Sequence, residues 1–142
     1  MASKLVSDVS AANAALGRRF FEEQDRLKGG PAESLCARDY QAVLGGNPPV
    51  DRGGHEGFAK AFYAAFEGMA HTIERVTADD RGVAVRFVIR GTHTGSFFGI
   101  PPTGRSVRIV ANVMMEVGEG KVTRLLGIFD EAGLLRQLGV IR

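Results

Sequence analysis

Apolar residues in the first part of the chain recur at helical spacing. Four of them fall on one stripe at intervals of seven, four and seven residues, namely Val9, Leu16, Phe20 and Leu27. This spacing predicts an amphipathic helix, which Ser7 or Ser10 would cap and which the glycine pair at 29–30 would end. A short helix over 31–36, a strand over 40–44 and a helix with a wide apolar face over 55–69 are predicted to follow.

From position 71 onward, apolar and polar residues alternate as in β-strands. Strands are predicted over 71–78, 83–90, 105–117 and 122–129, and a helix over 130–138 closes the chain. Helices that precede a meander of long strands predict an α+β fold rather than alternating βαβ units. Neither side of the glycine- and proline-rich loop at 45–54 is long enough to fold well alone, so we expect residues 1–142 to form one domain. A strongly curved sheet wrapped by helices would leave a conical cavity open at one end, which is a good ligand site.

Composition narrows the classes of partner. Of the 142 residues, 44% are hydrophobic and 24% are charged, as in ordinary globular proteins, and a net charge of +2 without long basic blocks argues against nucleic acid. No apolar run is long enough to cross a membrane, and the N-terminal segment lacks the apolar core of a secretion signal, so we expect a cytoplasmic protein without a membrane partner. The single cysteine, Cys36, excludes an internal disulfide, and His55, His71 and His93 show no metal-ligand spacing, so no metal site is expected.

The segment from Gly91 to Gly104, with the sequence GTHTGSFFGIPPTG, stands between two predicted strands. Its four glycines and its proline pair are incompatible with an ordinary strand. It also carries Phe97, Phe98 and Ile100, so it is not a simple solvated loop. We expect it to fold back over a core or a pocket, with its prolines fixing a bend.

This segment, continued to Arg105, closely resembles the signature of SnoaL-like polyketide cyclases, also called ester cyclases, and the closing run from Phe129 to Gly139 resembles the C-terminus of the same family. The resemblance implies the cone-shaped α+β barrel of nuclear transport factor 2, with N-terminal helices packed on a curved antiparallel or mixed sheet. It implies closure of a polyketide ring by intramolecular aldol condensation of a methyl ester, without a metal or organic cofactor, in a protein that forms a homodimer. It also places the family's general acid/base aspartate at Asp130.

Asp130 therefore has two interpretations. As a catalytic residue it would remove a carbon-bound proton; Leu126, Ile128 and Asp130 would then share the cavity face of the last strand. As the first residue of the terminal helix it would instead be an N-cap. His93 likewise either donates to an enolate oxygen or shuttles a proton, or it holds the loop by a hydrogen bond to a backbone carbonyl.

Further residues are candidates for contact with a flat hydrophobic substrate, although each of the apolar ones equally suits the core. The polar candidates are Tyr40, Asn112 and Glu116, and the apolar candidates are Phe20, Phe62, Phe97, Met114 and Leu126. The outer face of the sheet, with Val88, Val107 or Val110 among arginines, is the expected dimer interface.

Two other functions stay open. Enzymes of the same fold isomerise ketosteroids, dehydrate alcohols or open epoxides, and fold alone does not choose among these reactions. A non-catalytic protein that binds a hydrophobic ligand, or a dimeric accessory protein, is the alternative from another class. A sizeable cavity with Asp130 at its wall favours an enzyme, whereas Asp130 bonded only to helix amides favours the non-catalytic alternative.

Overall fold

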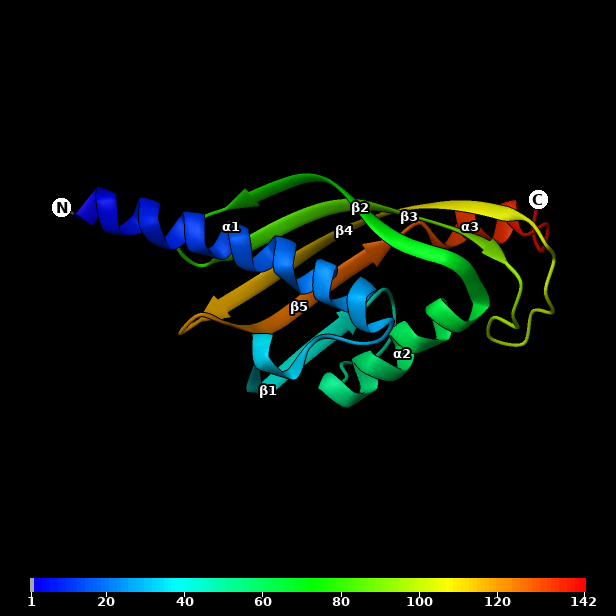
Figure 1. Ribbon diagram of the computed structural model, residues 1–142, viewed down its shortest axis with the longest axis horizontal. Coiled ribbons are helices and arrows are strands. Elements are labelled where there is room, and N and C mark those ends of the chain that lie inside the picture. Colours follow the sequence, from blue (N-terminus) through cyan, green and yellow to red (C-terminus); the bar gives the residue numbers. More distant parts are fainter. Residues whose placement is uncertain (1) are drawn as a thin grey trace.

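The computed structural model describes residues 2–142 and contains one five-stranded sheet with helices packed on it (Figure 1). The elements in chain order are α1 (Ala2–Leu27), a 3₁₀ helix (Glu33–Leu35), β1 (Cys36–Leu44), α2 (Arg52–Ala65), β2 (Phe66–Ala78), β3 (Gly82–His93), β4 (Ser106–Gly118), β5 (Lys121–Phe129) and α3 (Glu131–Gln137). The strands lie in the order β1-β5-β4-β3-β2, with β1 parallel to β5 and every other pair antiparallel. The predicted α+β fold, with helices on a mixed sheet, is confirmed.

Strict alternation along β4 decides which face of the sheet is covered. Its inward side chains are all buried, namely Val107, Ile109, Ala111, Val113 and Met115. They belong to the same core cluster as Phe20 of α1 and Phe62 of α2. The two helices therefore bury one face of the sheet, and the cavity described below lies between that face and the helices.

Helix α1 is longer than predicted. It runs from Ala2, so neither Ser7 nor Ser10 caps it. Leu16 and Phe20 are buried as the stripe predicts, but Val9 and Leu27, at its two ends, are exposed. The reason for Val9 is visible in Figure 1, where the first turns of α1 extend beyond the strands and have no surface to pack on.

Two predicted helix boundaries are wrong for a common reason. The predicted helix over 31–36 is a single 3₁₀ turn, because Cys36 already pairs with Val122 as the first residue of β1. The predicted helix over 55–69 ends at Ala65, because Phe66 enters β2 and pairs with His93. In both places strand pairing overrides an apolar pattern that also fits a helix.

The segment between β3 and β4 folds as a tight reversal. The backbones of Phe97 and Ile100 exchange hydrogen bonds of 3.0 and 2.8 Å, and Phe98 and Gly99 occupy positive φ angles of 42° and 84°. Phe97 is buried and packs edge-on against Phe62 with ring centroids 4.9 Å apart, whereas Phe98 is exposed. The expectation that this segment folds back over the core is therefore met by one of its two phenylalanines.

Candidate active site

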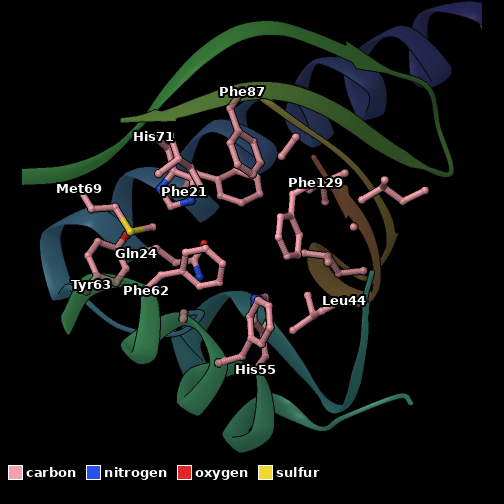
Figure 2. Close-up of a pocket in the computed structure, with 18 residues that line it drawn as sticks. Phe21, Gln24, Leu44, His55, Phe62, Tyr63, Met69, His71, Phe87 and Phe129 are labelled. Carbon is pink, nitrogen blue, oxygen red and sulfur yellow. The ribbon is translucent and has the colours of Figure 1, made fainter. Parts of the chain in front are cut away.

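A small cavity, called the inner cavity below, lies between α1, α2 and the covered face of the sheet (Figure 2). Its volume is about 80 Å³, and most of the surrounding side chains are aliphatic or aromatic. Four polar side chains share its wall, namely Gln24, His55, Tyr63 and His71. In Figure 2, His55 lies on the α2 side of the cavity and His71 on the side of the sheet.

A wider apolar depression, called the mouth groove below, adjoins the inner cavity. Its volume is about 840 Å³, and its lining includes residues of the loops at 46–50 and 97–100 and of α3. Leu44, Phe58 and Phe129 line both spaces, so these three side chains form the partition between them. The rings of Phe58 and Phe129 have centroids 6.2 Å apart.

Asp25 joins three elements beside the inner cavity. One carboxylate oxygen, Oδ1, lies 2.7 Å from His71 Nδ1 and accepts the Tyr63 hydroxyl at 2.6 Å, and Oδ2 accepts the His71 backbone N–H at 2.9 Å. Burial opposes the charge on Asp25, but the hydrogen bonds from His71 and Tyr63 outweigh this and lower the pKa of the carboxyl below its ordinary 3.8. The ionised carboxylate accepts the Nδ1 proton of His71, which leaves His71 Nε2 as the ring nitrogen available to a ligand.

His55 and Tyr40 form a second buried pair. Their contact joins His55 Nδ1 to the Tyr40 hydroxyl at 2.7 Å, and the two rings are stacked. Burial, with a smaller effect of His71, lowers the pKa of His55 to about 4, so the imidazole is neutral at pH 7. Burial also raises the pKa of Tyr40, which therefore keeps its proton and donates it to Nδ1. The neutral ring then carries its own proton on Nε2 and can donate it.

Asp130 does not line the inner cavity or the mouth groove. It is exposed, and its Oδ1 accepts the backbone N–H of Gly133 at 2.9 Å, as an N-cap of α3 does. The strand face expected for it is wrong for Leu126, which is 40% exposed while its neighbour Leu125 is buried. Ile128 is 72% exposed, although it also borders the inner cavity. The helix start at Asp130 is confirmed, and its catalytic role stays a prediction.

His93 is fully buried beneath the segment that follows it. Its Nδ1 accepts the backbone N–H of Thr103 at 3.1 Å and lies 3.0 Å from the Thr103 hydroxyl. Its own backbone N–H and C=O bond Arg105 and Gly104. These contacts fit a loop-holding role, but the backbone partner of the ring is the N–H of Thr103 and not a carbonyl as predicted, and His93 is not part of the wall of the inner cavity.

The candidate substrate contacts separate into two groups. Phe62 lines the inner cavity, Phe97 lines the mouth groove, and Phe20 and Tyr40 are buried next to His55. The remaining four are not inside the cone, because they occupy the outward positions of β4 and β5: Asn112, Met114, Glu116 and Leu126. Met114 is 66% exposed, and the alternation of β4 gives the inward position to its neighbours.

Sequence reasoning missed Gln24, Asp25 and Tyr63 and gave no role to His55 and His71. One signal was present in the helical pattern. Gln24 follows Phe20 by one helical turn, so a polar residue sits on a buried stripe. The contacts of Asp25 had no such signal, because its two partners lie 38 and 46 residues away.

The described part of the chain was also compared with the requirements of a metal site, a cysteine nucleophile and a membrane-spanning helix. Within residues 2–142, no group of three or more His, Cys, Asp or Glu side chains is arranged to hold a metal ion. Burial raises the pKa of the Cys36 thiol to about 11, which makes it a poor nucleophile. None of the helices in the same range combines the length and apolar character needed to cross a membrane.

Comparison with known proteins relates this chain to polyketide cyclases by both sequence and fold. The sequence profile of the family described as SnoaL-like polyketide cyclase matches residues 15–138. IdmH from Streptomyces antibioticus, a proposed polyketide cyclase, is 30% identical, with 94% of this chain and 98% of that chain covered and a TM-score of 0.69.

Two further crystal structures share the fold. AclR from Streptomyces galilaeus, a proposed hydroxylase, has a TM-score of 0.83 at 21% identity, with 94% of this chain and 88% of that chain covered. A proposed SnoaL-like polyketide cyclase from Jannaschia Sp. CCS1 has a TM-score of 0.80 at 17% identity, with 94% and 96% covered. No curated protein matches this chain.

Proposed function

This chain belongs to the SnoaL-like polyketide cyclase family, and on that premise we propose that it closes a ring in a hydrophobic polyketide-like ester by acid/base catalysis without a cofactor. The contact between Asp25 and His71 carries the proposal. It provides an imidazole that is oriented by a carboxylate and placed on the wall of an apolar cavity, which is a suitable arrangement for a general base.

The reaction needs one proton to leave and return. His71 Nε2 takes the proton from the carbon beside a substrate carbonyl, and Asp25 stabilises the imidazolium that forms. The resulting enolate carbon attacks a second carbonyl carbon of the same molecule, so one C–C bond forms and the attacked oxygen becomes an alkoxide. That oxygen takes the proton back from His71. The Nε2–H of neutral His55 donates a hydrogen bond to the enolate oxygen, where negative charge develops.

The two spaces divide the substrate between them. Ligand pockets commonly measure about 300–1,000 Å³, so the inner cavity of about 80 Å³ holds the reacting end and the mouth groove of about 840 Å³ holds the rest. The side chains of Leu44, Phe58 and Phe129 must then move apart as the substrate enters.

A direct test compares two candidate bases. The substrate is a methyl ester in which an activated methylene and a ketone can close a six-membered ring, and the product is followed by chromatography and mass spectrometry. His71→Asn keeps a donor for Asp25 but has no atom equivalent to Nε2, and turnover should fall by about a hundredfold or more. Asp130→Asn is the matched control, because Asn also caps helices well, and it should keep turnover. If Asp130→Asn lost turnover and His71→Asn kept it, Asp130 would be the general base instead of His71. If both variants kept turnover, the mechanism would be overturned.

A hydrophobic-ligand carrier is the second candidate, and two observations favour it. The mouth groove is large and mainly apolar, and the only hydrogen bond of the Asp130 side chain within residues 2–142 goes to a helix amide. A carrier would bind the ester in D₂O without exchanging the hydrogens of its activated methylene. An enzyme would exchange them faster than buffer does, and the NMR spectrum of the ester separates the two.

We also propose that the chain forms a homodimer through the outer face of the sheet. Val107 does not contribute, since it points inward, and Val88 is fully buried. The apolar surface is instead supplied by Met114, Leu126 and Ile128, which are exposed beside the half-buried Val110 and line or adjoin a shallow groove.

A further inference from the structure

One polar side chain of the inner cavity has an oxygen that the described part of the chain leaves without a partner. Gln24 is 3% exposed, and its Oε1 has no hydrogen-bond partner among residues 2–142. Native proteins rarely leave a buried carbonyl oxygen in this state, because the group has lost its water and gained nothing in exchange. Such an acceptor on a residue that lines a cavity therefore points to something that occupies the cavity.

The other polar side chains of the wall are already engaged. The Tyr63 hydroxyl and His71 Nδ1 both bond Asp25, and His55 Nδ1 bonds Tyr40. In the function proposed above, both histidines use their second ring nitrogen in the reaction: His71 Nε2 takes the proton beside a carbonyl, and His55 Nε2–H donates to the enolate oxygen. Gln24 Oε1 is different in kind, because a carbonyl oxygen only accepts and can neither take up nor release a proton at neutral pH.

We propose that Gln24 is a recognition residue for a hydroxyl group, so that the inner cavity selects ligands whose entering end carries a hydrogen-bond donor. An alcohol or phenol O–H satisfies Oε1, and the apolar remainder of the wall favours a ligand with few other polar groups. The recognition role of Gln24 rests on the proposed function only in requiring that the substrate enter the inner cavity.

The volume of the cavity supports a ligand end rather than a whole ligand. The inner cavity of about 80 Å³ is well below the roughly 300–1,000 Å³ of common ligand pockets, so it suits one end of a ligand. The reacting end of the substrate, with its hydroxyl group, occupies this space, and the bulk of the molecule remains beyond the partition. Figure 2 shows Gln24 among the lining side chains, with Phe62 and His71 also on the wall.

The test uses two probes of similar size, 2-naphthol and 2-methylnaphthalene, which differ by a hydroxyl in place of a methyl group. The chain has no tryptophan, so the fluorescence of the probes can be followed directly. The wild type should bind 2-naphthol about tenfold more tightly than 2-methylnaphthalene, as expected for one hydrogen bond to a buried acceptor. In Gln24→Met, which keeps the length of the side chain, the ratio should fall to within about twofold. Gln41→Met, at an exposed position of β1, is the matched control and should keep the wild-type ratio.

Stability distinguishes recognition from a structural role. Gln24→Met removes an unsatisfied acceptor, so its melting temperature should equal or exceed that of the wild type. A fall of more than about 5 °C in both Gln24→Met and Gln24→Leu would make Gln24 a structural residue and overturn the proposal. Equal affinity of the wild type for the two probes, or an unchanged ratio in both variants, would also overturn it. Neither probe can react, so these outcomes are independent of whether His71→Asn abolishes turnover.

Discussion

Acidification should destabilise this fold through His55 in a defined range of pH. Burial lowers the pKa of His55 from 6.5 to about 4 in the folded chain. Between these values the unfolded chain binds a proton that the folded chain does not, so the stabilisation is complete above pH 6.5 and is lost as the pH falls toward 4. The difference, 6.5 minus 4, at about 1.4 kcal/mol for each pH unit, corresponds to a full loss of about 3.5 kcal/mol in the free energy of unfolding, of which about 3 kcal/mol is lost by pH 4. No reduction for solvent screening is needed, because His55 is only 6% exposed.

The assay is urea unfolding followed by circular dichroism from about pH 8 to about pH 4, for the wild type and for His55→Asn. The Asn carbonyl can still accept the Tyr40 hydroxyl near the former Nδ1, but it does not titrate. The stability difference between the two proteins should be constant above pH 7 and should shrink by about 3 kcal/mol toward pH 4. Asp25 does not interfere, because its pKa lies below 3.8. Parallel curves over the whole range would refute the reasoning, since they would mean that folded His55 accepts a proton as easily as an unfolded histidine.

Three further changes test other contacts. Tyr63→Phe removes a hydrogen bond to partly exposed Asp25 and should lower the free energy of unfolding by about 1–2 kcal/mol in urea, and an unchanged value would contradict that contact. Asp130→Ala should cost about 1 kcal/mol in the same assay by removing the cap on Gly133, whereas Asp130→Asn should cost a few tenths. Leu126→Asp should leave the far-UV circular dichroism spectrum almost unchanged and convert a dimer to a monomer in light scattering; a monomeric wild type would contradict the dimer.

The sequence predicted the order of the elements and the start of the last helix, because these depend on local signals. Alternation identified β3, β4 and β5, and the preference of Asp for an N-cap identified residue 130 as the start of α3. It did not reveal which face of β5 is covered. Leu125 and Leu126 are both apolar, so a period of two fits either face. The helices decide the matter, and they leave Leu126 outside.

The polar contacts of the site could not be predicted for a different reason. The hydrogen bond from Tyr63 to Asp25 joins α2 to α1, and that between His71 and Asp25 joins β2 to α1. Each depends on how the helices pack on the sheet, which no spacing along the chain records. Tyr40, which the sequence did suggest, was expected to touch the ligand itself, and the structure instead places its hydroxyl on His55.

The hydrogen bonds around the inner cavity follow one rule, which makes the site more than a set of buried polar residues. Protein partners engage the Nδ1 atoms of His55 and His71, while the second nitrogen of each ring has no hydrogen bond to another of the residues 2–142. Gln24 adds an acceptor that is equally without a partner. In the proposed mechanism one atom takes a proton, one donates and one accepts, and all three belong to residues that line a small apolar space from helices or a strand rather than from loops. Groups fixed in this way before a ligand arrives lose little freedom when it binds. A core built for stability alone would have replaced Gln24 with an apolar residue, because an unsatisfied acceptor costs about 1–3 kcal/mol.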